Sequence, residues 1–270
     1  MKKRVISAMV FVLLWIAILV VDNIWFDTVF VVLLSVMATF EYIRAFKGIG
    51  HKPISWISYL GCASIIFCSG IIPQEYQILL IKILLPLVLI GAFGFIIFSN
   101  VKRSMTDLAI TILGLLYIPL TFAFMKLILG LENGRYYILF VFSGAFISDT
   151  FAFLVGSKFG KTKLAPDISP NKTVEGSIGG IVGVLIAFTI LAIVGKYSLD
   201  LNVNIVYWLF VGLVASVAGQ FGDLTASAIK RHCKIKDFGN IMPGHGGILD
   251  RFDSLMFVAP IVYIFIKLYI

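Results

Sequence analysis

The stretch SIGGIVGVLIAFTILAIVG, residues 177–195, contains no charged residue and decides the fold class of this chain. Its length matches the roughly 20 apolar residues that an α-helix needs to cross the hydrocarbon core of a bilayer. The apolar residues are continuous and do not alternate with polar ones, as they would in a half-buried strand. Because every backbone amide in lipid must be bonded within its own element, we expect a transmembrane helix over 177–195.

The same pattern recurs along the whole chain. Of its 270 residues, 60% are hydrophobic and only 13% are charged, a composition typical of membrane proteins that excludes an ordinary soluble domain. The predicted fold class is all-α, a polytopic integral membrane protein with about nine transmembrane helices. The apolar runs that predict these helices are 5–21, 28–46, 54–72, 77–98, 107–129, 136–157, 177–195, 203–222 and 254–269.

The distribution of basic residues predicts the orientation in the membrane. When the loops are numbered alternately, all but five of the 22 lysines and arginines fall on the same side. The positive-inside rule makes that side cytoplasmic, which puts the N-terminus inside and the C-terminus outside a cell membrane of the bacterial inner-membrane type. The five exceptions are Lys82, Lys126, Arg135, Lys196 and Lys267.

The net charge of +8 has the same origin. Basic loops on one side follow from topology and are attracted to anionic lipid headgroups. The basic loops are short and no nucleic-acid-binding fold accompanies them. The lipid bilayer is therefore the expected partner, and nucleic acid is not.

Two predicted cytoplasmic loops are longer than the others, at roughly 158–176 and 223–253, and polar loops on a rigid scaffold are where function is sought. We expect a single membrane domain over 1–270. In it, the N-terminal spans 1–100 would act as a scaffold and the C-terminal spans 107–270 would carry the catalytic motifs. Three further acidic residues near predicted span ends are expected to be solvated: Glu41, Asp107 and Asp200.

The second long loop begins on a helix that continues out of the eighth apolar run. Asp223, Ser227 and Lys230 are spaced i, i+4 and i+7, so they would form one stripe on that helix. At the end of the loop, Asp250 and Asp253 are three residues apart and would share a helix face. Carboxylates at two facing helix ends suit a hard cation, and Mg²⁺ prefers one or two carboxylates with waters and phosphate oxygens.

A glycine-rich turn, PGHGG at 243–247, lies between these two helices. Gly246 and Gly247 follow His245, and glycines permit unusual dihedral angles and let a ligand approach the backbone closely. Exposed amides in such a turn can form a nest that binds an anion. Cys233 lies alone in the basic part of the loop, and the three cysteines of the chain predict no disulfide framework.

The first long loop follows a carboxylate inside an apolar run. Asp149, in FISDTFAF, would be costly in a membrane and is expected to face a cavity or a partner. The sequence SPNKTVEG at 169–176 resembles a helix start, whose free amides can bind a phosphate, with Ser169 and Thr173 as hydroxyl donors. The basic residues of this loop are Lys158, Lys161, Lys163 and Lys172.

Four glycines come next, and they form two overlapping GxxxG pairs that predict helix packing rather than catalysis. These glycines are Gly176, Gly179, Gly180 and Gly183. A phosphate-rich substrate suits this combination of basic residues, hydroxyls, a glycine turn and acidic metal ligands. Because these loops lie at headgroup depth, the combination indicates phosphoryl or nucleotidyl transfer onto a membrane lipid.

The polar residues of the second loop resemble the signature of the phosphatidate cytidylyltransferase family, also called CDP-diacylglycerol synthases. The upstream region 148–180 resembles the other well-marked region of that family, and together the two cover about a quarter of the chain. The signature consists of Ser227-Ala-Ile-Lys230-Arg231, Lys236-Asp237-Phe-Gly239, Pro243-Gly-His245-Gly246-Gly247 and Asp250-Arg251-Phe-Asp253.

The resemblance implies an enzyme that makes CDP-diacylglycerol and pyrophosphate from CTP and phosphatidate, with Mg²⁺ as cofactor. It leaves open a second, monovalent cation and a homodimer. The implied metal ligands are Asp223, Asp250 and Asp253. The implied catalytic residues are Asp223, Lys230, Arg231, His245, Asp250, Arg251 and Asp253. The implied substrate-binding residues are Asp149, Ser169, Lys172, Thr173, Ser227, Lys236, Gly246 and Gly247.

Two other functions remain open on the sequence. A CTP-dependent lipid-alcohol kinase of similar membrane architecture would transfer the γ-phosphate and release CDP. A secondary transporter would use Asp149 as a proton or ion site, but such proteins often have internal repeats, and this chain has none at a fixed spacing. The spaced aspartates of CDP-alcohol phosphotransferases, which start from Asp-Gly, are also absent from the sequence.

Overall fold

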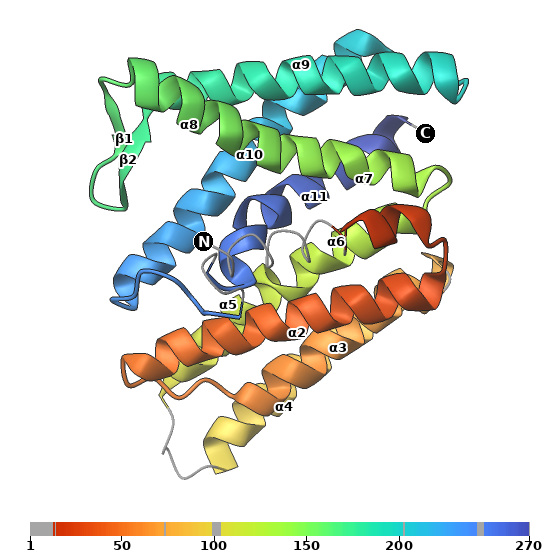
Figure 1. Ribbon diagram of the computed structural model, residues 1–270. Helices are drawn as coiled ribbons and strands as arrows, with labels where there is room; N and C mark the ends of the chain where they lie inside the picture. The colour runs from red at the N-terminus through yellow and green to blue at the C-terminus, as the bar shows by residue number, and fades with distance from the viewer. Residues whose placement is uncertain are drawn as a thin grey trace. The chain divides into compact units, whose positions relative to one another are not determined.

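The structure is a computed structural model and describes residues 13, 15–72, 74–98, 104–201, 203–241 and 246–269. Helices make up nearly all of the described chain, with one two-stranded sheet (Figure 1). The chain divides into two compact units. Unit 1 comprises Met1–Gly130 and Cys233–Asp250, and unit 2 comprises Leu131–His232 and Arg251–Ile270.

The described part of unit 1 contains the labelled helices α2 to α6, further helical residues at 15–20, and the returning segment Cys233–Asp250. The helices are α2 (Ile24–Gly48), α3 (Ser55–Ile71), α4 (Gln74–Phe98), α5 (Met105–Tyr117) and α6 (Pro119–Leu129). α5 and α6 form one long helical stretch that is interrupted before Pro119, where the missing backbone N–H prevents a regular α-helix.

Unit 2 contains the helices that carry most of the polar residues singled out by the sequence. They are α7 (Gly134–Phe142), one π-helical turn (Ser143–Ile147), α8 (Ser148–Phe159), the strands β1 (Lys163–Ala165) and β2 (Ser169–Thr173), α9 (Val174–Ser198), α10 (Ile205–His232) and α11 (Leu249–Tyr269). The boundary between the units falls in the first turn of α11, after Asp250.

The predicted all-α membrane fold is confirmed. In the part of the chain that the structure describes, six helical stretches have the length and apolar composition to cross a bilayer, and shorter apolar stretches cover Ser55–Ser69 and Pro86–Phe95. The predicted run 5–21 lies mostly outside the described residues, and the count of nine spans stays a prediction. The six long stretches are Ile24–Gly48, Met105–Leu129, Gly134–Phe159, Val174–Ser198, Ile205–His232 and Leu249–Tyr269.

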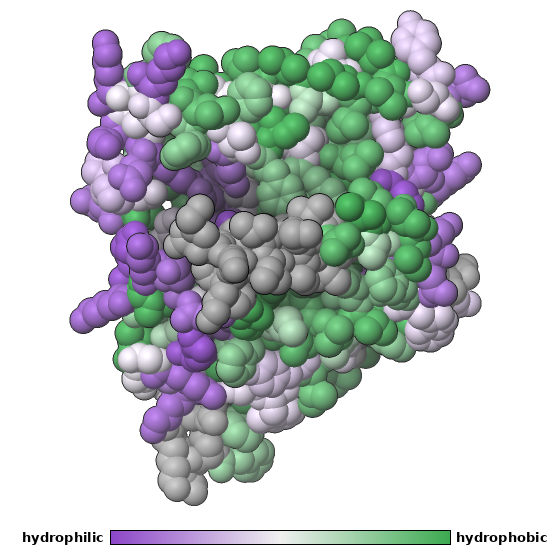
Figure 2. Space-filling view, viewed as in Figure 1, coloured by the Kyte–Doolittle hydropathy of each residue, from purple (hydrophilic) through white to green (hydrophobic). Residues whose placement is uncertain are grey.

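The helix predicted from 177–195 is α9, and it has one face for lipid and one for protein. Ile178, Val182, Ile186 and Ile190 recur every four residues and are about half exposed. In Figure 2, apolar side chains form a green band along the top of the view, where Figure 1 has α9. An exposed apolar stripe of this length is expected of a helix that faces lipid tails.

The opposite face of α9 packs closely against α8, and the two helices lie side by side (Figure 1). A Cβ atom on Gly176 would lie 2.7 Å from the carbonyl oxygen of Ala152, and one on Gly180 would lie 2.8 Å from that of Ser148. Small residues therefore let the two backbones approach closely. The predicted packing role of the GxxxG pairs is confirmed.

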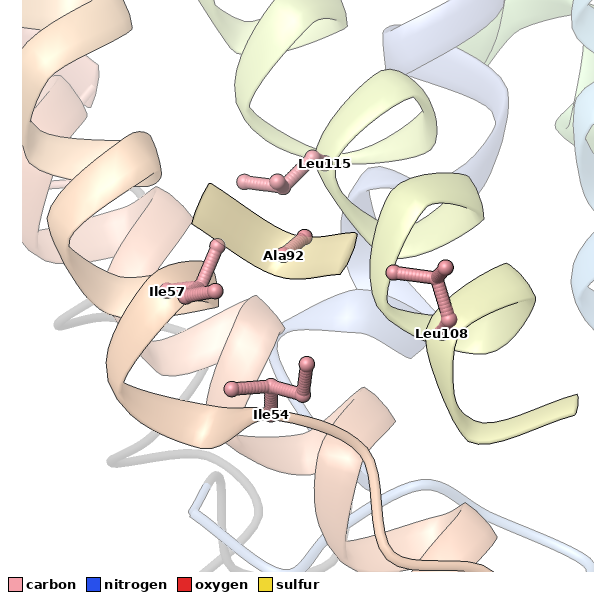
Figure 3. Close-up of a cluster of buried hydrophobic side chains, with 5 residues drawn as sticks. All are labelled: Ile54, Ile57, Ala92, Leu108 and Leu115. Atoms are coloured by element: carbon pink, nitrogen blue, oxygen red, sulfur yellow. The ribbon is translucent and has the colours of Figure 1, made fainter. Parts of the chain in front are cut away.

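The core of unit 1 includes a cluster of apolar side chains from α3, α4 and α5. Ile54, Ile57, Ala92, Leu108 and Leu115 are buried against one another (Figure 3). Because the cluster draws on three helices, it ties together segments that are far apart in the sequence.

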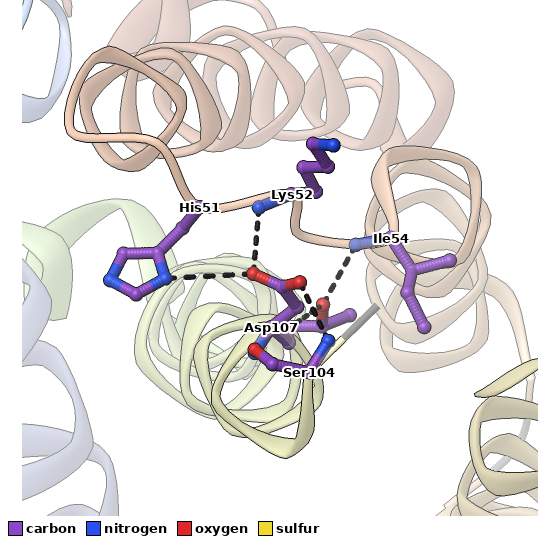
Figure 4. A network of polar contacts seen from close by, with 6 residues as sticks. His51, Lys52, Ile54, Ser104 and Asp107 are labelled. Atoms are coloured by element: carbon purple, nitrogen blue, oxygen red, sulfur yellow. Dashed lines mark hydrogen bonds and ion pairs between the residues drawn. The ribbon is translucent and has the colours of Figure 1, made fainter. Parts of the chain in front are cut away.

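A buried carboxylate organises the start of α5 beside this cluster. Asp107 is only 4% exposed, and its carboxylate accepts hydrogen bonds from the backbone N–H of Lys52 at 2.7 Å and of Ser104 at 3.0 Å (Figure 4). His51 lies 3.6 Å from the same carboxylate. The expectation that Asp107 is solvated is therefore wrong, because the residue closes a capping box and binds a neighbouring loop. Asp200 is exposed, as expected.

The packing of α8 on α9 can be tested at Gly180. Alanine is favoured over glycine in a helix by about 1 kcal/mol, but a Cβ atom at Gly180 would collide with the α8 backbone, and such overpacking costs about 1–3 kcal/mol. We expect Gly180→Ala to lower the thermal unfolding midpoint in detergent by a few degrees.

Gly94→Ala in α4 is the matched control, since a Cβ atom there would meet nothing within 4 Å. It should leave the midpoint unchanged or raise it. Equal midpoints for the two variants would contradict the close packing of α8 on α9.

Candidate active site

A pocket of about 440 Å³ opens in unit 2 between α8, the β1–β2 hairpin, α9 and α10. Four residues from the predicted site line it: Asp149, Lys172, Thr173 and Asp223. The rest of the lining is partly apolar and partly polar: Ala152, Phe153, Gly156, Ser157, Leu164, Asn171, Gly176, Ser177 and Gln220. The pocket therefore brings residues of the first long loop together with a carboxylate from the second.

Asp149 enters this pocket from the first turn of α8, directly after a π-helical turn. A π-helical turn inserts an extra residue into the helix and often occurs at functional sites. The carboxylate accepts a hydrogen bond of 3.3 Å from the hydroxyl of Ser254 in α11. The expectation that this intramembrane carboxylate faces a cavity and a partner is confirmed.

The hairpin carries Lys172 and Thr173 to the pocket. β1 and β2 pair antiparallel, with Lys163 opposite Thr173, and the turn between them contains Pro166, which favours a tight turn. This small sheet inside the first long loop was not predicted from the sequence. A three-residue strand has too short a pattern to be recognised by alternation.

The predicted helix start at 169–176 is confirmed, because α9 begins at Val174. Thr173 is its N-cap, and the Thr173 hydroxyl accepts a hydrogen bond of 3.1 Å from the backbone N–H of Gly176. Glu175 accepts hydrogen bonds from the backbone N–H groups of Lys161 and Thr162. These contacts hold the loop before β1 against the first turn of α9, which itself borders the pocket.

An ion pair joins Lys172 to Asp223 at the pocket, and both side chains are about one-quarter exposed. Asp149 interacts electrostatically with Asp223, Lys172 and Arg251. The pocket therefore combines two carboxylates with Lys172, and Lys172 and Arg251 offset the repulsion that Asp149 meets from Asp223.

Asp253, in α11, is a third carboxylate of this group and is buried. It interacts electrostatically with Asp223, Asp149 and Lys230, and one of its oxygens accepts a hydrogen bond of 2.7 Å from the backbone N–H of Ser254. A buried carboxylate requires such partners, since burying a charge alone is very costly.

The predicted stripe on α10 is confirmed, because α10 continues unbroken to His232. Ser227 is buried on this helix, whereas Arg231 is exposed and its Nε donates a hydrogen bond of 3.2 Å to the carbonyl oxygen of Ile168 in the hairpin turn. Ser169 starts β2 but does not line the pocket. Arg231 thus connects the hairpin to α10.

Four of the described predicted site residues belong to unit 1: Lys236, Gly246, Gly247 and Asp250. One oxygen of Asp250 accepts hydrogen bonds from the backbone N–H of Phe238 at 2.8 Å and of Gly247 at 3.0 Å. Gly246 has a φ of 88°, a backbone conformation that residues other than glycine rarely adopt. Lys236 is exposed, and His245 lies outside the described residues.

The described residues contain no group of three or more His, Cys, Asp or Glu side chains arranged to hold a metal ion. Of the predicted ligands, Asp223 and Asp253 belong to unit 2 and Asp250 to unit 1. The set of three carboxylate ligands therefore stays a prediction.

Gln220 is a polar residue of the pocket that was not predicted from the sequence. Gln220 lies within the eighth apolar run, and its side chain is hydrogen-bonded to the hydroxyl and, at 3.1 Å, to the carbonyl oxygen of Ser177 in α9. A polar side chain inside a membrane span is itself a signal of function or of a partner. Gln220 is three residues from Asp223 and so could have been included in its stripe.

Glu41 was also missed, and the expectation that it is solvated is wrong. It is fully buried in α2, and its carboxylate is hydrogen-bonded to the backbone of Ile248 and Leu249. Its position near a span end gave no indication of this, since the partners are about 200 residues away in the sequence.

Comparison with known proteins shows the family of this chain. The model of the cytidylyltransferase family matches residues 2–269, and the chain belongs to this family.

The relatives are phosphatidate cytidylyltransferases. That of Bacillus subtilis (strain 168) is 34% identical over 280 residues, which cover 100% of this chain and 98% of the relative. That of Staphylococcus aureus (strain COL) is 34% identical over 272 residues, covering 98% of each chain. A third, from Staphylococcus haemolyticus (strain JCSC1435), is 43% identical over 171 residues, which cover 63% of this chain and 64% of the relative.

Proposed function

We propose that this chain is a phosphatidate cytidylyltransferase, which transfers CMP from CTP to phosphatidate and so produces CDP-diacylglycerol and pyrophosphate for phospholipid biosynthesis. The observation that carries the proposal is the match over nearly the whole chain to enzymes of that name. The pocket of unit 2 supports it, because a lysine and two carboxylates line one cavity in a bundle of apolar helices.

The chemistry of this transfer suits such a pocket. A phosphate oxygen of phosphatidate bonds to the α-phosphorus of CTP, the bond from that phosphorus to the bridging oxygen breaks, and pyrophosphate leaves with the electron pair. The attacking oxygen is already an anion near pH 7, so no strong general base is needed. The obstacle is repulsion between two polyanions, which fixed cations and oriented amides reduce.

Within unit 2, Lys172 and Thr173 are best placed to meet the CTP phosphates, because they line the pocket at the first turn of α9. Lys172 can exchange its contact with Asp223 for a phosphate oxygen when CTP binds. Lys230 and Arg251 would add positive charge around Asp253 and Asp149. The roles of Arg231, Lys236, His245, Ser169, Ser227, Gly246 and Gly247 in binding substrate remain proposals that rest on the resemblance.

The donor atoms of the pocket suit Mg²⁺. Asp149 and Asp223 offer carboxylate oxygens in one cavity, and Mg²⁺ needs only one or two carboxylates when waters and substrate phosphates complete its shell. When bound, Mg²⁺ would stabilise the charge that develops on the triphosphate. Asp250, Asp253 and a second, monovalent cation remain proposed parts of the ion site.

The chain is a multi-pass membrane protein, and we propose that its two long loops lie in the cytoplasm, with the N-terminus inside and the C-terminus outside. The support is the one-sided distribution of lysine and arginine. This orientation would let cytosolic CTP reach the pocket while phosphatidate arrives from the bilayer. The homodimer left open by the sequence stays a prediction, and the mass of the protein in detergent, measured by light scattering, tests it.

Labelled CTP tests the reaction directly. Purified protein is incubated with phosphatidate, Mg²⁺ and CTP that carries label at either the α or the γ phosphorus. We expect the α label to appear in lipid and the γ label in pyrophosphate, because the bond that breaks lies between the α and β phosphates. Transfer of the γ label to a lipid would instead identify a CTP-dependent kinase and would refute the proposal.

Asp223→Asn tests the proposed role of this carboxylate. The change keeps the shape but removes the charge that faces Lys172 in the pocket. We expect label transfer to fall by roughly a hundredfold or more, since losing a metal ligand or its charge commonly costs a few kcal/mol in the transition state.

Asp200→Asn is the control for this prediction. Asp200 is exposed and has a φ of 50°, a conformation that asparagine tolerates, so the variant should keep full activity. Detergent gel filtration shows whether each variant is folded. Full activity of a folded Asp223→Asn variant, with unchanged Mg²⁺ dependence, would exclude Asp223 as a metal ligand.

The orientation is tested with Ser169→Cys in a background that lacks the three native cysteines. Ser169 begins β2 in the first long loop. If that loop is cytoplasmic, an impermeant thiol reagent should not label the new cysteine in intact cells and should label it once the membrane is opened. Labelling in intact cells would reverse the proposed orientation.

A further inference from the structure

A carboxylate from α2 binds the start of α11 inside unit 1. The Glu41 oxygens accept hydrogen bonds from the backbone N–H of Ile248 at 3.1 Å and of Leu249 at 2.8 Å. Leu249 is the first residue of α11. The backbone N–H groups at the start of a helix have no acceptor within the helix, and Glu41 supplies one for these two donors. Hydrogen bonds to a carboxylate are stronger than those to a neutral acceptor, and a negative charge is favoured at this end of a helix.

Two glycines of the signature leave room for this carboxylate. A Cβ atom on Gly239 would lie 2.2 Å from one Glu41 oxygen, and a Cβ atom on Gly247 would lie 2.3 Å from the other. Both distances are far below van der Waals contact, so no side chain fits at either position without moving Glu41 or the backbone. The backbone at Gly239 and at 247–249 therefore lies directly against the Glu41 carboxylate.

The same segment holds Asp250. The Asp250 carboxylate accepts a hydrogen bond from the N–H of Gly247, which also packs on Glu41, and a second one from the N–H of Phe238. Glu41 and Asp250 also interact electrostatically. Glu41 thus holds the backbone at 247–249 in place, and the N–H of Gly247 in turn orients the Asp250 carboxylate.

We infer that Glu41 is a positioning residue of the enzyme: it anchors the described parts of the signature segment, 238–241 and 246–250, to α2 and thereby sets the place and direction of the Asp250 carboxylate. The inference rests on the proposed function, in which Asp250 takes part in binding Mg²⁺. It gives α2 the task of orienting a proposed metal ligand of its own unit, beyond that of a scaffold. Partners that orient a metal ligand without touching the metal commonly change affinity or activity by 10–100-fold when they are removed.

Glu41→Gln is the main variant, because glutamine has the same shape but no charge. Its side-chain oxygen can accept one of the two hydrogen bonds, and its NH₂ group would face the other backbone N–H, donor against donor. We expect it to raise the Mg²⁺ concentration for half-maximal label transfer by about tenfold or more. A role limited to stability would lower the unfolding midpoint without this change in Mg²⁺ dependence.

Cys233 provides a second readout that requires neither Mg²⁺ nor activity. Its side chain is 3% exposed and lies near Tyr42, the neighbour of Glu41 in α2. Burial raises the pKa of the Cys233 thiol, so the docked thiol should react slowly with a maleimide, which attacks the thiolate. The measurement uses protein with Cys62→Ala and Cys68→Ala, so that Cys233 is the cysteine left to react. Glu41→Gln should increase the rate of Cys233 labelling by about tenfold or more, because the residues around Cys233 then leave their packed position more often.

Asp107→Asn is the matched control. Asp107 is another buried carboxylate of unit 1 that accepts two backbone hydrogen bonds, but from Lys52 and Ser104 instead of the signature segment. It should lower the unfolding midpoint and leave both the Mg²⁺ dependence and the Cys233 labelling rate at wild-type values.

Gly239→Ala approaches the same contact from the other side, because its Cβ atom would displace the Glu41 carboxylate. It should shift both readouts in the same direction as Glu41→Gln. Gly48→Ala, at the end of α2, is its control, since a Cβ atom there meets nothing within 4 Å.

Wild-type values of both readouts in folded Glu41→Gln would overturn the inference, and so would equal shifts in Asp107→Asn. If Glu41→Gln gives no folded peak in gel filtration, Gly239→Ala decides by the same two readouts. Failure of both to fold would make the role of Glu41 structural and would also overturn the inference. Should the wild-type protein transfer no label, the proposed function fails, whereas the Cys233 rates still test the anchoring of the segment.

Discussion

The close approach of α8 and α9 is the constraint on which the site in unit 2 depends. Gly176 and Gly180 bring the backbone of α9 against carbonyl oxygens of α8. In lipid, the surroundings of a helix are as apolar as its side chains, so close van der Waals packing must replace the hydrophobic effect as the force between helices. This packing puts Asp149, at the start of α8, and Thr173, at the start of α9, around one pocket.

Polar contacts then specify how α10 joins this pair. Ser148 in α8 and Ser216 in α10 are 3.1 Å apart at their hydroxyl oxygens, and Gln220 in α10 is hydrogen-bonded to Ser177 in α9. Each group would be costly in lipid without a partner. Because the polar side chains of the three helices satisfy one another's hydrogen bonds, the register of α10 is fixed. The position of Asp223, one turn beyond Gln220, is fixed with it.

Unit 1 uses buried carboxylates for a different purpose. Asp107 accepts hydrogen bonds from one backbone N–H of the loop before α3 and one at the start of α5, and Glu41 accepts those from two N–H groups at the start of α11. In both cases a single side chain satisfies donors that a short loop could not satisfy by itself, as buried backbone groups require. The returning segment Cys233–Asp250 becomes part of unit 1 through such contacts as well as through buried residues such as Phe238.

The sequence by itself determined the class of the protein, because features of that kind are local. A charge-free run such as 177–195 must be a helix in lipid, the spacing of Asp223 and Lys230 puts them on one stripe of α10, and the signature at 227–253 indicates the family. Only the tertiary structure decided which polar residues meet. The sequence does not indicate the partners of Gln220 and Glu41, and it suggests Asp253 as the partner of Asp250. Their hydrogen bonds are instead with Ser177, with Leu249 and with Gly247, respectively. The reason is physical: buried polar atoms must find partners wherever the packing of helices supplies them, and that packing joins residues whose separation along the chain carries no pattern.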